Sequence, residues 1–253
     1  MFRNAIVRTP CPAMINGLSF ADLGKPDYLR ALEQHEAYIE ALKTCGVEVT
    51  VLPEDNQFPD SCFVEDVALC TPNGAILTCP GADSRRNEVA SIKDVVSRFY
   101  DNVFSIEYPS TVEAGDIMMV ADHYYIGLSK RTNKSGAKEV IKHLNKLGLT
   151  GETIEIHELL HLKTGVSYLE NNNLLVAGEL LENKVFKRFN TIPIRENEVY
   201  ASNSIWINGN VIMPAGYNKT CEKVRVLGYK VIEVEMSEFR KLDGGVSCLS
   251  LRF

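Results

Sequence analysis

Four stretches of the chain repeat one pattern of apolar and polar residues. In each stretch an apolar, β-forming run is followed by a short polar break and then by a second apolar run. Asn73-Gly74 and Asn208-Gly209 stand in two of these breaks, and Asn-Gly between apolar runs is a strong signal for a β-hairpin. The pattern therefore predicts hairpins at residues 63–79, 116–127, 166–177 and 204–213.

Helical periodicity follows most of these hairpins. Apolar residues recur at helical spacing, and Gly148 and Gly228 stop two of the segments. Each helix leads into a further apolar strand. The unit is thus a hairpin, a helix and a strand, recurring at roughly 40–50 residues, a period typical of repeat architectures. The predicted helices are residues 86–100, 135–147 and 219–227, and the strands after them are residues 103–107, 153–156 and 229–234.

The two ends of the chain complete the pattern. Residues 4–9 read as a strand with no hairpin partner before it, and residues 246–253 as a strand with no partner after it. Because an unpaired strand edge is a liability, we expect these two strands to pair with each other. With a helix at 28–45 and a strand at 47–52, they make a fifth unit. The prediction is one α/β domain over residues 1–253, built as a five-bladed α/β propeller; the alternative is a generic open α/β sheet.

Composition narrows the partners and the compartment. Lys and Arg number 27 against 33 Asp and Glu, so the net charge is −6 and nucleic acid is a poor partner. The apolar runs are too short to span a membrane, and the first residues do not resemble a signal peptide. Seven cysteines, an odd number, favour a reducing, cytoplasmic location over a disulfide framework.

Closure of a five-bladed ring would direct the residues at the mouth of each hairpin toward one axis. The chemically unusual residues of the chain stand at these mouths, and the Gly244-Gly245 pair lets the backbone bend or approach a ligand closely. We expect several carboxylates, one histidine and one cysteine to share a pocket. They are Asp60, Glu65, Asp66, Glu113, Asp116, His161 and Cys248.

Five motifs that contain these residues resemble one family, the dimethylarginine dimethylaminohydrolases of the guanidine-modifying (pentein) superfamily. That family has a five-fold α/β propeller. The resemblance implies hydrolysis of Nω-methylated L-arginine to L-citrulline and methylamines through a covalent cysteine intermediate, with a small-molecule substrate and neither metal nor cofactor. The motifs span nearly the whole chain in order: Phe58-Pro-Asp-Ser-Cys-Phe-Val-Glu-Asp66, Glu113-Ala-Gly-Asp116, Arg131-Thr-Asn133, His161-Leu-Lys-Thr-Gly165 and Gly244-Gly-Val-Ser-Cys-Leu-Ser-Leu-Arg252.

The resemblance assigns the catalytic roles to three residues. Cys248 attacks the guanidinium carbon, His161 protonates the leaving amine and then activates water, and Glu113 orients His161 and the substrate. The chemistry of these residue types fits on its own. A resonance-stabilised carbon needs a strong nucleophile, and thiolate is the strongest among side chains. A poor amine leaving group needs a proton donor, which histidine supplies near neutral pH.

The resemblance also assigns the substrate contacts. Carboxylates suit a planar guanidinium, and arginines suit a carboxylate. Asp66 would hold the guanidinium and Asp60 the α-ammonium group, while Leu18 would act as a lid. Arg85 and Arg131 are assigned to the α-carboxylate, and Glu65, Leu242 and Ser247 complete the predicted substrate-binding set.

Residues 157–161 match the zinc-protease pattern His-Glu-x-x-His. That pattern binds zinc only on a helix, where both imidazoles share one face. Here a predicted strand runs into His157, little room for a helix follows His161, and a third ligand is not obvious. We therefore interpret His161 as the partner of Cys248 and not as a metal ligand.

Other functions stay open at this point. Hydrolysis of arginine itself or of citrulline is the nearest alternative. Arginine deiminases and amidinotransferases place an Asp two residues after the catalytic His, where this chain has Lys163, which favours a methylated nitrogen. The ribosome anti-association factors use the same fold for binding alone, but they need no Cys, His and carboxylate set. The oligomeric state is open, with a homodimer as one option.

Overall fold

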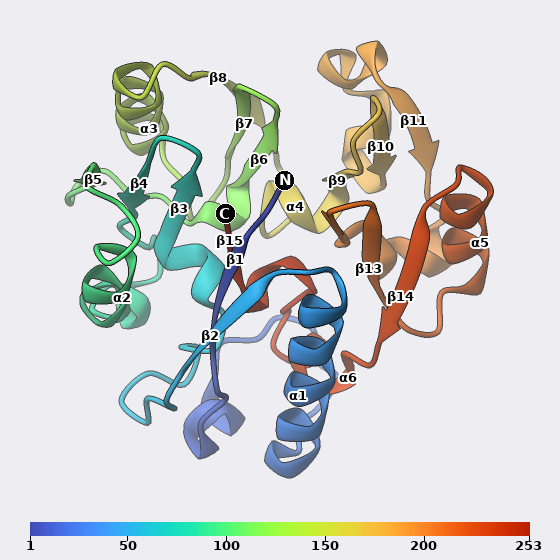
Figure 1. The fold of residues 1–253 in the computed structure, drawn as a ribbon, viewed down its shortest axis with the longest axis horizontal. Helices are drawn as coiled ribbons and strands as arrows, with labels where there is room; N and C mark the ends of the chain where they lie inside the picture. Colours follow the sequence, from blue (N-terminus) through green and yellow to red (C-terminus); the bar gives the residue numbers. More distant parts are fainter.

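The strands of the protein form five separate sheets of three strands each. A computed structural model describes residues 1–253, and in Figure 1 the five sheets surround a common centre. The chain is therefore an α/β protein built from five small sheets. Their orders are β15-β1-β2, β3-β4-β5, β6-β7-β8, β11-β10-β9 and β12-β13-β14.

Every sheet follows one pairing rule. The middle strand is antiparallel to its inner neighbour and parallel to its outer one. The inner strands are β15 (Leu251–Arg252), β3 (Ala68–Thr71), β6 (Ile117–Val120), β9 (Val166–Tyr168) and β12 (Ile205–Ile207). The middle strands are β1 (Asn4–Arg8), β4 (Gly74–Leu77), β7 (His123–Leu128), β10 (Asn173–Val176) and β13 (Asn210–Pro214). The outer strands are β2 (Glu48–Leu52), β5 (Val103–Ser105), β8 (Thr150–Glu155), β11 (Asn190–Pro193) and β14 (Lys230–Val234).

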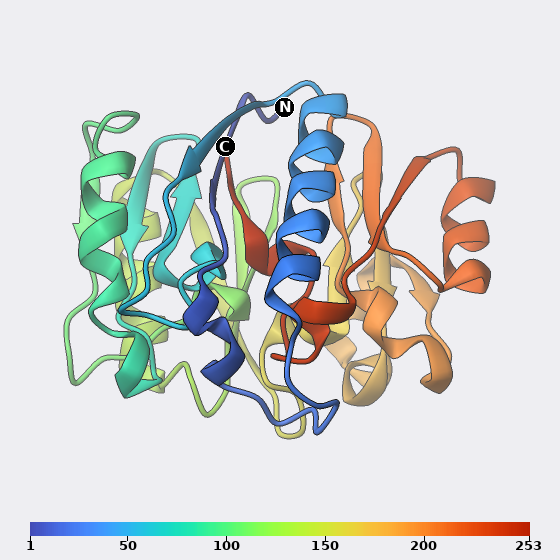
Figure 2. The same ribbon diagram turned by 90° about the horizontal axis from the view of Figure 1, so that it is seen from below.

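The predicted hairpins and the pairing of the two chain ends are confirmed. Strand β1 lies antiparallel to β15, with Ala5 opposite Arg252 and Ile6 opposite Leu251. The Asn208-Gly209 turn joins β12 to β13 with positive φ at both residues, the conformation that this dipeptide adopts most readily. Both termini therefore lie at one edge of the molecule, and the dark-blue segment before the first helix reaches the opposite edge (Figure 2).

Four long helices cross from a middle strand to the parallel outer strand of the same sheet. Helices α1 (Tyr28–Thr44), α2 (Glu88–Val96), α3 (Lys134–Lys146) and α5 (Asn218–Val226) lie outside the strands in Figure 1. Asp27 caps α1 by accepting a hydrogen bond from the Arg30 amide, and Asn133 caps α3 in the same way through Gly136. In the remaining sheet two 3₁₀ turns, Gly178–Glu182 and Lys184–Arg188, replace the helix. Two further helices of one turn are α4 (Leu162–Gly165) and α6 (Ser237–Arg240).

Three sequence predictions need correction. The first predicted hairpin, residues 63–79, begins with the 3₁₀ turn η2 (Val64–Val67), and its first strand starts only at Ala68. The strand expected at residues 246–253 contains a 3₁₀ turn, η8 (Ser247–Leu249), and only Leu251–Arg252 pairs with a neighbour. The turn prevails because the backbone and side chain of Ser247 bond to other loops, which an extended strand would not allow. Strand β11 was not predicted, because Asn190–Pro193 is short and half polar. No helix of the structure is both long and apolar enough to cross a membrane.

A short helical turn precedes every inner strand. The turns are η2 (Val64–Val67), η4 (Ala114–Asp116), α4, η7 (Glu196–Ser202) and η8. Turn η2 contacts η4 and η8, and α4 contacts η4 and η7. Because the inner strands themselves lie side by side, as in the contacts of β6 with β9 and β9 with β12, the five turns meet near the centre. The fold thereby gathers side chains from segments that are far apart in sequence.

Candidate active site

One small pocket collects most of the predicted site residues. Its cavity volume is about 40 Å³, and its walls come from the turns before the inner strands and from the loops around them. Nine of the eleven predicted site residues line it: Leu18, Asp60, Asp66, Arg85, Glu113, Arg131, His161, Leu242 and Cys248. Gly244, one of the two glycines noted in the sequence, also lines it, and so do four residues that the sequence did not single out for the site: Phe20, Phe63, Leu160 and Asp243.

His161 and Glu113 form a buried pair. The Nε2 atom of His161 lies 2.7 Å from Oε2 of Glu113, which is fully buried. The Glu113 carboxylate also accepts hydrogen bonds from Nη1 of Arg131 at 3.1 Å and from the Ala82 amide at 3.1 Å. A carboxylate with three such partners is held in one orientation, and it holds the imidazole in turn.

Asp66 is fixed from two sides. Its Oδ2 atom accepts a hydrogen bond from Nη1 of Arg85 at 2.5 Å, and its Oδ1 atom accepts one from the Gly115 amide at 3.1 Å. A Cβ atom at Gly115 would lie 2.6 Å from Nδ1 of His161 and 2.8 Å from Oδ1 of Asp66. The glycine of the Glu113–Asp116 motif is therefore needed so that both side chains can approach the backbone.

Arg85 is almost completely occupied by the protein. Besides Asp66, its guanidinium donates to the Glu88 carboxylate and to the carbonyl oxygens of Asp60 and Phe63. Arginine has five N–H donors, so one Nη1 hydrogen is left for a ligand. Arg131 has a partly exposed side chain and spends its side-chain bonds on Glu113 alone. Of the two predicted carboxylate-binding arginines, Arg131 is thus the more available.

Two carboxylates hold the predicted lid loop over the pocket. The Leu18 amide donates to Oδ1 of Asp60 at 3.0 Å, and the Phe20 amide donates to Oδ2 of Asp243 at 2.6 Å. The side chain of Leu18 lines the pocket although the residue is 38% exposed. The bond from Ser19 Oγ to the Lys241 carbonyl is a third polar contact between this loop and the rest of the protein.

Cys248 is the middle residue of the turn η8, and its side chain is almost fully buried. The residue is 9% exposed, and Sγ accepts a hydrogen bond from the Gly245 amide at 3.3 Å. The Tyr200 hydroxyl donates to the Gly244 carbonyl at 2.6 Å. A Cβ atom at Gly244 would overlap the Phe63 ring and one at Gly245 the Asn203 side chain, which explains why two glycines stand here.

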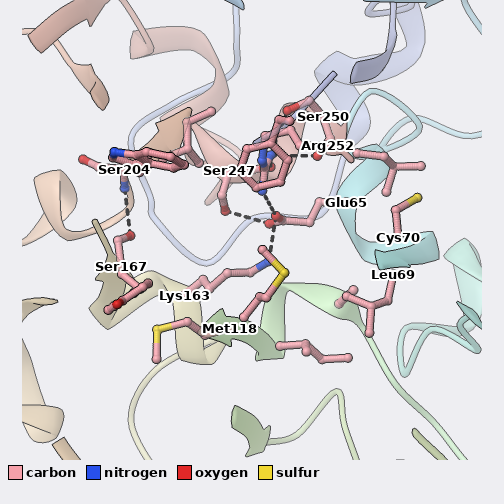
Figure 3. A pocket seen from close by; sticks show the side chains of 18 of the residues that line it. Glu65, Leu69, Cys70, Met118, Lys163, Ser167, Ser204, Ser247, Ser250 and Arg252 are labelled. Carbon is pink, nitrogen blue, oxygen red and sulfur yellow. Dashed lines mark hydrogen bonds and ion pairs between the residues drawn. The ribbon is translucent and has the colours of Figure 1, made fainter. Parts of the chain in front are cut away.

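Three residues expected at the site do not line this pocket. Asp116 is buried and accepts hydrogen bonds from the Leu162 amide and from Ser129 Oγ. The side chains of Glu65 and Ser247 point away from the pocket. Figure 3 shows them in a second cavity of about 120 Å³, on the other side of the turns. Ser247 Oγ donates to the Glu65 carboxylate at 2.6 Å, and Lys163 and Arg252 form ion pairs with it at 2.6 and 2.8 Å. The reason is the geometry of the 3₁₀ turns, which have about three residues per turn, so successive side chains point in different directions and the neighbours of Asp66 and Cys248 face another side.

Asn203 is a structural residue of the site that the sequence analysis missed. Its amide group donates to the Lys163 carbonyl at 3.0 Å and to Ser247 Oγ at 3.1 Å, and its Oδ1 accepts from the Ser247 amide at 2.8 Å. It thereby links the loop that follows His161 to the turn that carries Cys248. No periodicity or motif marks this residue in the sequence; only the meeting of two distant loops does.

The charges of the pocket set the protonation states of the catalytic groups. Burial, together with the nearby Glu65 and Asp66 carboxylates, raises the pKa of the Cys248 thiol to about 12. For His161 burial alone lowers the pKa, but Asp66, Asp116 and Glu113 outweigh it and raise the pKa to about 9. At neutral pH the empty site therefore contains a neutral thiol and a protonated imidazole.

Glu113 shows the opposite balance. Burial raises its pKa, but the hydrogen bond and charge of His161 and the charges of Arg85 and Arg131 outweigh burial, so the pKa is lowered overall. Asp60, by contrast, has a raised pKa, because burial there exceeds the effect of Arg85 and of the bond from the Leu18 amide. The carboxylate that holds the imidazole is thus fully ionised near neutral pH.

The metal-binding options of the site are limited. His157 is exposed and does not lie on a helix, and neither does His161, so the His-Glu-x-x-His residues do not present two imidazoles on one helical face. Asp66, Glu113 and His161 do place one ligand atom each within 4.8 Å of the others. These three are already engaged with Arg85, with Arg131 and with one another.

Known proteins are similar to this chain over its full length. The family model described as eukaryotic N,N-dimethylarginine dimethylhydrolase matches residues 25–189. The N(G),N(G)-dimethylarginine dimethylaminohydrolase of Pseudomonas aeruginosa is 58% identical over 254 aligned residues and covers 100% of both chains. The chain belongs to the dimethylarginine dimethylaminohydrolase family.

A more distant relative and a solved structure agree with this assignment. The N(G),N(G)-dimethylarginine dimethylaminohydrolase of Streptomyces coelicolor is 34% identical, over 99% of this chain and 96% of its own. The solved structure of the Pseudomonas aeruginosa protein, a cysteine-to-serine variant in complex with citrulline, superimposes with a TM-score of 0.99 at 58% identity over 100% of both chains. The resemblance expected from the five motifs is thus confirmed.

The first prediction concerns the ionisation of Cys248. The carboxylates that raise its pKa should be partly neutralised by a bound cation, so a slowly reacting cationic ligand should lower that pKa. We expect thiolate absorbance to be nearly absent at neutral pH in the free enzyme and to appear when the ligand binds. Cys248→Ser corrects for the other cysteines. A thiolate already present in the free enzyme, and unchanged by the ligand, would contradict the prediction and point to protonated His161 as the activator.

The second prediction concerns metal. Because the candidate ligands are already paired, we expect full activity after exhaustive chelation. Activity is measured before and after treatment, and again after zinc is added back. Loss of activity that zinc restores would show that Asp66, Glu113 and His161 form a working metal site.

Proposed function

We propose that this chain hydrolyses Nω-methylated L-arginine, both asymmetric dimethylarginine and monomethylarginine, to L-citrulline and di- or monomethylamine. The observation that carries the proposal is that one pocket combines a thiol, an imidazole held by a carboxylate, and further groups suited to a cation and to a carboxylate. The relatives named for dimethylarginine hydrolysis, and the citrulline in one of their structures, support the same reaction.

The proposed binding mode uses the two ends of the pocket differently. Asp66 receives the guanidinium, and Asp60 receives the α-ammonium group beside the Leu18 lid. Arg131 contributes most of the grip on the α-carboxylate, and Arg85 adds its one remaining N–H while it holds Asp66 in place. Leu242 contributes apolar wall. Glu65 and Ser247 support the turn of Cys248 from the other cavity instead of touching the substrate.

The proposed chemistry has two halves. The thiolate of Cys248 attacks the guanidinium carbon, and protonated His161 gives its proton to the substituted nitrogen, whose bond to carbon then breaks. The amine leaves, and the remaining carbon is bonded to the sulfur of Cys248 as a thiouronium intermediate. His161, now neutral and oriented by Glu113, takes a proton from water as it attacks. The carbon–sulfur bond breaks, and citrulline and the thiol are released.

Lys163 supports the choice of a methylated nitrogen. It stands two residues after His161, and its amino group is 2.6 Å from Oε1 of Glu65. No carboxylate is therefore supplied from this position to a second guanidinium nitrogen, and a nitrogen with methyl groups has fewer hydrogens to satisfy. Arginine would leave one nitrogen poorly bonded in the same place.

We further propose that the whole chain acts as one catalytic domain whose five sheets form a closed five-bladed ring. All seven cysteines are free thiols, which suits the reducing cytoplasm. The net charge of −6 supports a small-molecule substrate over nucleic acid or a membrane surface as partner. A homodimer is compatible with the proposal, although no step of the reaction requires a second chain.

The third prediction tests the function and its nucleophile. Citrulline formation is measured with arginine, monomethylarginine and asymmetric dimethylarginine, and ornithine formation with citrulline, and we expect turnover of the two methylated substrates to dominate. Cys248→Ser should abolish turnover and leave the circular dichroism spectrum unchanged, since the substitution is small. Cys62→Ser is the matched control: it buries a hydroxyl in the core, so it should cost about 1–3 kcal/mol of stability and spare the chemistry. Preference for arginine, or substantial turnover by Cys248→Ser, would reject the proposal.

The fourth prediction tests substrate anchoring. Arg131→Ala should raise KM for amino-acid substrates roughly ten- to hundredfold, the usual effect of losing a hydrogen bond to a charged group. Simple alkylguanidines lack a carboxylate, so they should lose much less. Arg86→Ala is the control, because Arg86 pairs with Asp83 outside the pocket and should matter for neither substrate. Equal losses for both substrate types would show that Arg131 acts through Glu113 alone.

A further inference from the structure

A third cavity of about 250 Å³ adjoins the catalytic pair. His161, Asp243 and Cys248 line both this cavity and the active-site pocket, so the nucleophile and the proton donor stand between the two spaces. Thr164, Val199 and Tyr200 form part of its remaining wall. We call this space the substituent chamber.

The carboxylates are divided unequally between the two spaces. Asp60, Asp66 and Glu113 line the pocket only, while the chamber has no carboxylate of its own beyond the shared Asp243, which is bonded to the Phe20 amide. The Lys163 amino group on the chamber wall is ion-paired with Glu65. Guanidinium N–H groups therefore find their partners in the pocket, and a substituted nitrogen loses nothing by facing the chamber.

One side of the chamber wall, at Val199 and Tyr200, suits an uncharged alkyl group. The Tyr200 hydroxyl is occupied by the Gly244 carbonyl, so the ring presents its apolar surface beside Val199. Arg240 lies over the Tyr200 ring at 5.0 Å and donates to the Tyr217 hydroxyl. Together with protonated His161 it makes the chamber unfavourable for a cationic substituent.

The chamber is much larger than two methyl groups require. A site for one water-sized group needs roughly 10–15 Å³ of cavity volume. With about 250 Å³, the chamber has space for many such groups, whereas the pocket with about 40 Å³ has space for few. If the substituent on the guanidinium nitrogen faces the chamber, the size of the chamber, and not that of the pocket, limits how long this substituent can be.

We propose that the substituent chamber receives the Nω-substituent of the substrate and the amine that it becomes, and that it admits unbranched alkyl groups longer than methyl. The inference rests on the proposed function. It predicts that the enzyme hydrolyses Nω-propyl-L-arginine by the same steps: Cys248 bonds to the guanidinium carbon, propylamine leaves with a proton from His161, and water releases citrulline.

The fifth prediction compares two substrates of the wild-type enzyme. Citrulline release gives kcat/KM for Nω-monomethyl-L-arginine and for Nω-propyl-L-arginine, and we expect the two values to agree within about tenfold. A confined methyl site would penalise two extra methylenes far more, because each is worth on the order of 10-fold or more in a close-fitting pocket. A larger loss for the propyl substrate therefore overturns the inference. No turnover of monomethylarginine is a different result, since it rejects the proposed function itself.

A matched pair of variants locates the substituent. Val199 and Val231 are both partly buried and pack against the same hydrophobic cluster, but only Val199 lines the chamber. Val199→Trp should lower kcat/KM for the propyl substrate at least about tenfold more than for the methyl substrate. Val231→Trp should leave the ratio of the two unchanged. Equal losses on both substrates in Val199→Trp would place the substituent elsewhere and overturn the inference; if this variant does not fold, the wild-type ratio decides.

Discussion

A single buried carboxylate, that of Glu65, joins the parts on which the active site depends. It pairs with Lys163 and Arg252 and accepts a hydrogen bond from Ser247. Lys163 follows His161 in α4, whereas Ser247 and Arg252 belong to the C-terminal segment that carries Cys248 and β15. Removing one member of such a buried network costs about 3–5 kcal/mol, because a charge is left without a partner. These bonds therefore hold the turns of Asp66 and Cys248 and the loop of His161 at one mutual spacing.

The same carboxylate influences the chemistry on the other side of the turns. Together with burial and with Asp66, it raises the pKa of Cys248, so the resting thiol is protected from unwanted reactions. Asp66, which receives the cationic guanidinium, also helps to keep the thiol neutral in its absence. Binding and activation are thus two consequences of one charge arrangement, and they arise together when the guanidinium enters.

The division of space around Cys248 and His161 follows from the architecture. Turns that converge from five directions leave separate cavities on different sides of the atoms that they bring together. The active-site pocket is lined by several acidic residues and covered by the loop of Leu18. The substituent chamber is lined by Tyr200 and Val199 among others, and its one carboxylate is that of Asp243. A substrate with a cationic centre, an amino-acid end and an alkylated nitrogen matches this arrangement of one acidic and one spacious side.

The sequence by itself determined the repeat, the hairpins and the pairing of the chain ends, because period-2 and helical patterns, Asn-Gly turns and unpaired strands are local signals. It also indicated nine of the residues that line the pocket, since their motifs are short and contiguous. Only the tertiary structure decided which way Glu65 and Ser247 point, because one residue of shift along a turn exchanges the two sides. The role of Asn203, the occupied guanidinium of Arg85 and the second space beside Cys248 were also decided there, since each arises where loops distant in sequence meet and compete for the same hydrogen bonds.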